Sequence, residues 1–390
     1  MSTAPSLPPA LRSLLEAGGS LVRRSSSGRV GLARIADVVP ADALPATLSR
    51  WPAELGAAHA AATVPWAPAD VERVLKSAWG SAPAKVLDSL DPEPLAVTPA
   101  AQVHRGVHDG RPVAIKVLRP GLAAGVRSDL SLLDLLATPV RQVFGAMDAG
   151  AILREIRETA LDELDLEHEA SNQRQVRRLL RGIEGLVIPA PDLELSGESV
   201  LVTELLDGLT LDEATPDDPG PLARLLVTAH VTAARGGIAL TDLRPGHVLL
   251  LPDGRVGLLG AGVSRPADRE RVAAALAALA HLRGGDQDGF TVAVSEALAV
   301  LPAGCALKAY ALISTLVGDL LLGEALLDGP ALATAAERGM EHLGGALALA
   351  DEVTPRPGDL AVVRSFGQVA ALLSRLGATE DWGALMLAAA

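Results

Sequence analysis

The chain has 390 residues, of which 49% are hydrophobic and 2% aromatic, and its formal net charge is −13. This length allows two or three domains with a large core, in which Ala, Leu and Val take the place of the scarce aromatic residues. The negative charge argues against nucleic acid as a partner, and the single cysteine, Cys305, excludes an internal disulfide and fits a reducing compartment.

The sequence shows no segment that would place the chain in a membrane. Its N-terminus lacks the basic start and apolar run of a signal peptide. A membrane span needs about 18 uncharged apolar residues, and Asp319 and Glu324 interrupt the best candidate, Ala309–Leu327. We therefore expect a cytoplasmic protein without a transmembrane segment, and the composition leaves peripheral contact with a membrane open.

The first 100 residues read as helices joined by loops. The expected helices are Leu7–Ala17, Pro40–Leu55 and Ala69–Trp79. Pro68 and Asp70 suit the first turn of the third helix. These helices predict an N-terminal helical extension, which we place at residues 1–93.

From Gln102 the apolar pattern changes to that of strands. Asp109 and Gly110 form a turn signal between two apolar or alternating runs, which predicts a hairpin. The expected strands are Gln102–Val107, Arg111–Leu118, Leu186–Pro191 and Ser199–Glu204, and the expected helices among them are Ser128–Leu136 and Ala151–Leu180. Together they predict a small β-containing lobe, which we place at residues 94–208.

The stretch around which the chain is organised is a polar loop followed by a second hairpin. The loop carries Asp242 and His247, and the runs Val248–Leu251 and Val256–Leu259 flank an Asp-Gly turn. Before it, Pro221–Arg235 reads as a helix; after Pro266 the chain reads as almost wholly helical to Ala390. We place this helical lobe at residues 209–390.

This order of parts is that of a protein kinase. In a kinase, a loop carries the catalytic Asp and, five residues on, a metal-binding Asn; a hairpin follows, and then a second metal-binding Asp. Here Asp242 matches the first group, whereas His247 and Gly260 stand at the two metal-ligand positions. The sequence thus predicts an α+β, bilobal protein-kinase-like fold in which two of three polar groups have changed.

Lys116 ends a Val-Ala-Ile-Lys strand, the place of the kinase lysine that contacts phosphates and pairs with a helix glutamate. That tetrapeptide alone fits a surface strand equally well. The acidic helix Ala160–Gln173 offers many carboxylates, most of which read as a solvated face. The residues alone do not single out a partner for Lys116.

The chain resembles the UbiB/AarF atypical kinases over roughly residues 7–300. The motifs are Ala101–Arg105, Val113–Gly121, Glu163-Leu164-Asp165, Glu169–Asn172 and Glu204–Gly208. The resemblance implies that Glu169 pairs with Lys116. It also implies that ATP or ADP binds between the small-residue loop with Ala100 and Ala101 and a hinge with Glu204 and Leu206.

The chain departs from that family at several points. Arg23–Ser26 replaces an N-terminal Lys-x-Gly-Gln motif, and Pro99 removes a backbone N–H from the small-residue loop. At the two metal-ligand positions, Gly260 has no side chain to offer, and the imidazole of His247 is a poor ligand for Mg²⁺. Asp253 and Asp268 are the nearest substitute acids, but one lies in the turn and the other beyond Pro266. We therefore expect a degenerate metal site with no well-defined ligand.

The resulting prediction is a pseudokinase or nucleotide-binding accessory protein, with Asp242 as a residual catalytic group. The resemblance suggests partners in isoprenoid quinone biosynthesis or lipid metabolism. One alternative is an active phosphotransferase that acts on a small molecule, lipid or protein, with His247 helping to hold a metal. The other is an interaction scaffold that binds no nucleotide.

Overall fold

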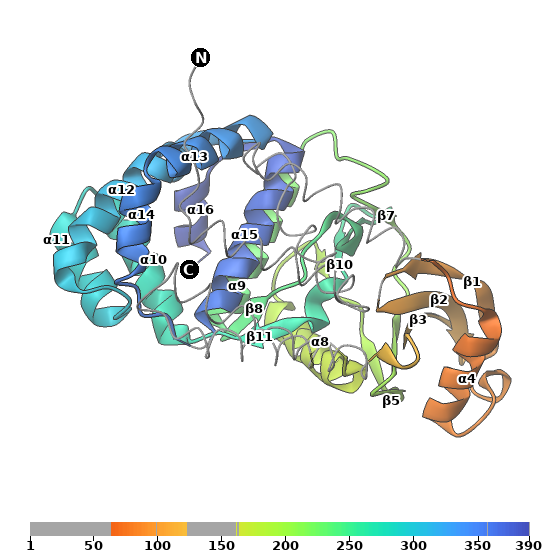
Figure 1. Cartoon of the computed structure of the whole chain (residues 1–390). Coiled ribbons are helices and arrows are strands. Elements are labelled where there is room, and N and C mark those ends of the chain that lie inside the picture. The colour runs from red at the N-terminus through yellow and green to blue at the C-terminus, as the bar shows by residue number, and fades with distance from the viewer. Residues whose placement is uncertain (1–63, 99, 123–160, 162–163, 357, 390) are drawn as a thin grey trace, which may run out of the picture.

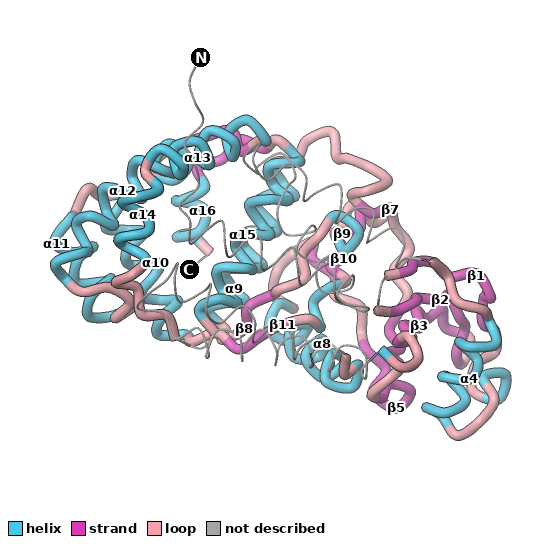
Figure 2. Tube along the Cα trace, in the orientation of Figure 1, coloured by secondary structure: helices cyan, strands magenta, loops and turns pink. Residues whose placement is uncertain are grey.

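The computed structural model describes residues 64–98, 100–122, 161, 164–356 and 358–389. Strands β1–β3 and helix α4 lie at one end of the molecule and helices α10–α14 at the other (Figure 1). Figure 2 shows that strands predominate at the end with α4, whereas the end with α10–α14 is mainly helical. The predicted helices at 7–17, 40–55 and 128–136 lie outside the described residues.

The small lobe is built on a five-stranded antiparallel sheet with the order β1-β2-β3-β6-β5. Its strands are β1 (Ser89–Val97), β2 (Ala101–His108), β3 (Arg111–Leu118), β5 (Pro191–Gly197) and β6 (Val200–Glu204). Asp109 and Gly110 turn the chain between β2 and β3 with φ values of 49° and 71°, a conformation that favours Asp-Gly. The predicted first hairpin is confirmed. β1 begins at Ser89, so the sheet includes residues ahead of 94.

Strand β3 divides the small lobe into two faces, because successive side chains point to opposite sides of a sheet. Ile115 and Val117 pack in one cluster with Val71 and Leu75 of α4 (Pro68–Trp79). Lys116, between them, faces the cleft on the other side. Of the predicted N-terminal helices, α4 packs on the small lobe, on the face of the sheet away from the cleft.

Helix α8 (Leu166–Leu180) lies on the cleft side of the sheet, where Leu166 and Ala170 pack against Leu201. It begins at Leu166 because Asp165 is extended and accepts hydrogen bonds from the N–H groups of Glu167 and His168 at 3.0 and 3.1 Å. The predicted helical region Ala151–Leu180 is therefore interrupted at Asp165. The predicted strand Leu186–Pro191 is also divided, since β4 (Leu186–Val187) pairs with β10 and only Pro191 belongs to β5.

The organising loop lies between short strands. The strands here are β7 (Leu209–Thr210), β8 (Ile238–Leu240), β9 (Val248–Leu250), β10 (Val256–Leu258) and β11 (Ser264–Pro266). β9 and β10 pair antiparallel, which confirms the predicted second hairpin, and β8 pairs with β11. The loop from Thr241 to His247 thus starts at one strand pair and ends at another, which fixes both of its ends.

The large lobe is a helical bundle. Its helices are α9 (Gly220–Arg235), α10 (Arg269–Arg283), α11 (Gln287–Val292), α12 (Ala303–Leu321), α13 (Gly329–Glu341), α14 (Leu343–Ala350), α15 (Asp359–Leu376) and α16 (Trp382–Ala388). The main core cluster joins α8, α9, α15 and the β8–β10 region. The helical expectation after Pro266 misses β12 (Glu324–Leu327) and β13 (Ala378–Asp381), which pair antiparallel.

Among the described helices, α12 is long and apolar enough to cross a membrane when judged by length and composition. This finding differs from the expectation that the chain has no segment able to span a membrane. Only 17% of its apolar window is buried. Its neighbours include α11, α13 and α14, so it packs as part of the bundle (Figure 1).

Buried His230 on α9 predicts that the protein loses stability in mild acid. Its side chain is 1% exposed, and burial lowers its pKa from 6.5 to about 4. Between these two pH values His230 is protonated in the unfolded state and neutral in the folded state. The free energy of unfolding therefore falls as pH falls from about 6.5 to about 4. We expect a slope on the order of 1 kcal/mol per pH unit from this group.

Chemical denaturation of wild type and His230→Leu between pH 4.5 and 7 measures that slope. The variant should be less sensitive to pH than wild type. His342→Leu is a matched control, because each histidine places Nδ1 on the carbonyl four residues earlier (2.8 and 3.0 Å), but His342 is exposed. Equal slopes in wild type and His230→Leu would contradict the prediction.

Candidate functional site

A cleft of about 920 Å³ lies between the two lobes. Its lining residues come from both lobes and from the segment that connects them. The lining includes Ala100, Ala101, Ala114, Lys116, Glu169, Glu204, Leu205, Leu206, Asp207, Gly208, Asp242, Arg244, His247, Gly260, Gln368, Leu372 and Arg375. The structure therefore brings all the sequence-predicted site residues to one cavity.

Lys116 and Glu169 form an ion pair across 53 residues of sequence. The Lys116 Nζ donates to both carboxylate oxygens of Glu169 at 2.7 Å. The side chains are 25% and 10% exposed, so the pair is shielded from solvent on the Glu169 side. A buried carboxylate is costly unless it is paired. The predicted contact between these two residues is present, and their part in ligand binding stays a prediction.

Gly262 lets helix α8, and with it Glu169, approach the short turn that follows β10. A Cβ atom at Gly262 would lie 2.6 Å from Cγ and 2.7 Å from the carbonyl oxygen of Glu169. No side chain fits in that space. The Gly260-Ala261-Gly262 turn is thereby packed against the helix that carries the lysine's partner.

The small-residue loop closes on itself. Ala100 and Ala101 are 6% and 1% exposed. The Ala101 N–H donates to Oγ1 of Thr98 at 2.9 Å, and the Thr98 N–H donates to the Ala101 carbonyl at 2.8 Å. The Ala101 N–H is thus bound within the loop. Ala100 and Ala101 line the cleft mainly as small, close-packed walls.

The hinge lies between β6 and β7. The Glu204 N–H donates to the Ala190 carbonyl at 2.8 Å, and the Leu205 N–H donates to the Pro112 carbonyl at 3.2 Å. Leu206 lines the cleft and lies over Gly257, where a Cβ atom would come within 2.9 Å of its Cδ1. Glu204 and Leu206 therefore line the cleft where the two lobes join, and their part in ligand binding stays a prediction.

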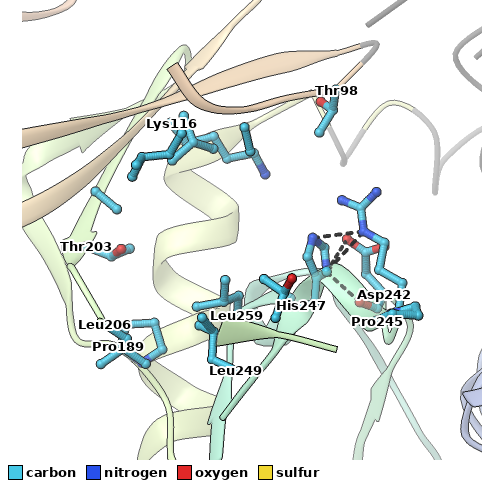
Figure 3. Close-up of a pocket in the computed structure, with 18 of the residues that line it drawn as sticks. Thr98, Lys116, Pro189, Thr203, Leu206, Asp242, Pro245, His247, Leu249 and Leu259 are labelled. Atoms are coloured by element: carbon cyan, nitrogen blue, oxygen red, sulfur yellow. Dashed lines mark hydrogen bonds and ion pairs between the residues drawn. The ribbon is translucent and has the colours of Figure 1, made fainter. Parts of the chain in front are cut away.

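His247 is locked in one neutral form beside Asp242. A carbonyl only accepts hydrogen bonds, so Nδ1 of His247 carries the proton that it donates to the Asp242 carbonyl at 2.8 Å. Nε2 then accepts from Nε of Arg244 at 2.9 Å. Burial, followed by the charge of Arg244, lowers the pKa of His247 to about 4. Both ring nitrogens are committed to protein partners (Figure 3).

Asp242 has an 11% exposed side chain beside a guanidinium. Nε of Arg244 lies 3.8 Å from Oδ1 of Asp242, and Nδ1 of His247 lies 3.4 Å from Oδ2. Figure 3 shows Lys116 and Thr98 on one side of the cavity, and Asp242 and His247 facing them from the other. Asp242 thus lies at the end of the cleft where Lys116 also points.

Gly260 has no room for a side chain. A Cβ atom there would overlap the carbonyl oxygen of Asp242 and lie 2.5 Å from Nδ1 of His247. The substitute acids serve elsewhere: Asp253 accepts from Nε of Arg255 at 2.7 Å, and Asp268 caps α10. Among the residues described, no group of three or more His, Cys, Asp or Glu side chains is arranged to hold a metal ion.

Residues 60–293, more than half of the chain, match the model of the ABC1 atypical kinase-like domain. The chain belongs to the ABC1 atypical kinase-like family. This match confirms the family predicted from the motifs of the sequence.

Relatives of this ABC1 family member include two proteins named probable protein kinase UbiB. The protein from Aliivibrio fischeri strain MJ11 is 33% identical over 175 residues, which are 42% of this chain and 32% of the relative. The one from Marinobacter nauticus is 28% identical over 235 residues, or 57% and 41% of the two chains. The matched segments are therefore less than half of these relatives.

A solved structure shares the fold along nearly the whole chain. It is the complex of Rv3197 with erythromycin from Mycobacterium tuberculosis, with a TM-score of 0.64, 21% identity and 96% of each chain covered. The predicted α+β, kinase-like fold with an N-lobe sheet and a helical C-lobe is thereby confirmed. The domain boundaries at 93 and 208 stay predictions.

Two sets of cleft residues cannot be predicted from the sequence. Arg244 lies inside the organising loop, but a lone arginine in a polar loop carries no signal of a role in a site. Gln368, Leu372 and Arg375 come from α15, beyond the segment that matches the ABC1 family. No local pattern in α15 marks it as a wall of a cleft.

Proposed function

We propose that this ABC1-family protein binds ATP or ADP without a metal ion and transfers phosphate poorly or not at all. The observation that carries the proposal is the arrangement of Asp242, His247 and Gly260. The imidazole of His247 fills the space next to Gly260, and both of its nitrogens are already hydrogen-bonded.

The residues present do not fit Mg²⁺. This ion is hard, requires oxygen ligands in an octahedral arrangement and is usually held by carboxylates. Asp242 is the one carboxylate left at the three kinase positions, and Gly260 has no space for another. Phosphoryl transfer relies on metal charge and on positioning. Asp242 could still orient a hydroxyl, but it cannot supply the missing positive charge.

Lys116 and Arg244 provide positive charge at the same end of the cleft. Nε of Arg244 lies 2.9 Å from Nε2 of His247, and Lys116 faces the same end of the cavity from the other side (Figure 3). Glu204 and Asp207 line the hinge, whereas Asp212 lies beside Gly246 of the organising loop. We propose that the phosphates of the ligand point toward Lys116 and Arg244, each of which also has a carboxylate beside it, Glu169 and Asp242. Arginine is well suited to bidentate phosphate contacts.

A thermal-shift titration with ATP and ADP, in EDTA and then in Mg²⁺, tests the proposal. A ligand at 100 times its Kd stabilises the folded state by about 2.7 kcal/mol. We expect the same stabilisation in EDTA and in Mg²⁺. Stabilisation that requires Mg²⁺ would favour an active phosphotransferase, and no stabilisation would favour a scaffold. Robust Mg²⁺-dependent phosphotransfer that Asp242→Asn abolishes would overturn the proposal.

The link to isoprenoid quinone or lipid metabolism is a separate part of the proposal and rests on the family resemblance. With it we propose a cytoplasmic protein that contacts the membrane peripherally and acts through quinone-biosynthesis or lipid-metabolism proteins. Quinone and lipid profiles of a deletion strain complemented with wild type or with Lys116→Met would test it. Identical profiles in the deletion and wild-type strains would remove this link.

A further inference from the structure

Helix α15 reaches the candidate site from outside the family-matching segment. It packs against α9 and β8 (Figure 1), and its N-terminus is held by Asp359, whose carboxylate pairs with Arg271 of α10 at 2.6 Å. Four of its residues line the cleft: Gln368, Ala371, Leu372 and Arg375. One of these, Gln368, makes direct hydrogen bonds to the backbone of the organising loop.

The side-chain amide of Gln368 spans Asp242. Its Oε1 accepts from the Leu243 N–H at 3.1 Å, and its Nε2 donates to the Thr241 carbonyl at 3.0 Å. Because the backbone N–H can only donate and the carbonyl can only accept, the orientation of the amide is determined. Gln368 is 4% exposed, and its partners Leu243 and Thr241 are 4% and 1% exposed.

Backbone groups buried at this level need partners. Thr241 is further held by Val263, whose carbonyl accepts from its N–H at 3.1 Å and from its hydroxyl at 3.0 Å. The Asp242 carbonyl is held by His247. Gln368 therefore completes the set of hydrogen bonds that holds the backbone from Thr241 to Leu243 in place. The charge of Asp242 also acts on Arg364 of α15, raising a pKa that burial lowers.

From these contacts we infer that Gln368 is a positioning residue of the cleft, which makes α15 part of the site. It holds the Thr241–Leu243 backbone, and through it places the side chains of Asp242 and Arg244. The inference rests on the proposed function for its ligand, a metal-free nucleotide, but the placement of the loop can be measured without a ligand.

The test compares three variants of the full chain. Gln368→Met removes both hydrogen bonds at nearly constant length, and Gln368→Glu keeps the acceptor for the Leu243 N–H. Val369→Ala is the matched control, since Val369 is the next residue of α15, is 4% exposed and belongs to the main core cluster. It weakens the packing of α15 and keeps both hydrogen bonds of Gln368 to the loop.

Hydrogen exchange by mass spectrometry, on peptides that isolate the Leu243 amide, is the first readout. We expect about tenfold faster exchange in Gln368→Met, the scale of one lost buried hydrogen bond. Gln368→Glu should stay closer to wild type. Val369→Ala should lower the Tm but leave this amide protected at temperatures well below the transition. Unchanged exchange in Gln368→Met, or equal acceleration in Val369→Ala, would overturn the inference.

The affinity for ADP in EDTA is the second readout. It should weaken about three- to tenfold in Gln368→Met and stay unchanged in Val369→Ala. If wild type binds no nucleotide, the proposed function fails, and the exchange of the Leu243 amide still decides whether Gln368 positions the loop. If wild type binds ADP and Gln368→Met binds it equally well, the proposed function stands and the positioning role falls.

Discussion

Gly260→Asp should destabilise the protein by about 3 kcal/mol without creating a magnesium site, because overpacking a filled interior typically has this cost. The new Cβ atom would overlap the backbone carbonyl of Asp242 and approach Nδ1 of His247. A backbone atom cannot rotate away as a side chain can. Urea unfolding of wild type and variant measures the loss.

Gly182→Asp is a suitable control for Gly260→Asp, because a Cβ atom at Gly182 meets nothing within 4 Å. We expect the control to change the free energy of unfolding by less than about 0.5 kcal/mol, as is usual for surface substitutions. A Gly260→Asp protein as stable as the control would show that the loop has space for a carboxylate.

The double variant Gly260→Asp/His247→Asn tests whether the kinase ligands can be restored together. Removing the imidazole relieves one of the two close contacts and leaves the Asp242 carbonyl in place. We expect part of the stability to return, with no Mg²⁺-dependent stabilisation and no phosphotransfer with Mg²⁺ or Mn²⁺. Metal-dependent turnover by this variant would mean that the backbone retains the geometry of an active kinase.

Lys116→Met should weaken the binding of ADP in EDTA about tenfold and also destabilise the protein. The first effect is the scale of one lost charge-assisted bond. The second arises because Glu169, 10% exposed, would lose the ammonium that its two oxygens share. Calorimetric titration gives the affinity, and denaturation gives the stability.

Two further variants separate these effects. Lys76→Met makes the same substitution at an exposed position of α4 and should alter neither quantity. Lys116→Met/Glu169→Gln removes the unpaired charge, so it should recover stability but not affinity. Unchanged ADP affinity in Lys116→Met would remove Lys116 from the site, whatever happens to stability.

Sequence reasoning succeeded where the signal is local or where motifs follow one another in order. An Asp-Gly turn between apolar runs suffices for each hairpin, and the order of the lysine strand, acidic helix and polar loop suffices for the kinase-like layout. The Lys116–Glu169 contact needed the family pattern, because the acidic helix offers several carboxylates of equal local merit. The beginning of that helix at Leu166 was not predicted, because Asp165, one of several acids there, serves as its N-cap.

The remaining features depend on contacts between distant residues. Gln368 reaches Leu243 across 125 residues, and nothing in its helix distinguishes it from a solvent-facing glutamine. β12 is a four-residue strand of helix-forming residues, and β13 is equally short; neither carries a local strand pattern, and they form strands by pairing with each other. The lowered pKa of His247 depends on burial and then on the charge of Arg244, which appear only in the folded cleft.

The close fit of His247 against Gly260 also makes the two positions depend on each other. A side chain at position 260 would place an atom where the imidazole and a carbonyl already lie. Replacing His247 alone removes the ring that bonds both the Asp242 carbonyl and Arg244, and gains no carboxylate in exchange. We therefore expect each single substitution to give a less stable protein. Selection on single substitutions would then not bring a carboxylate to this turn.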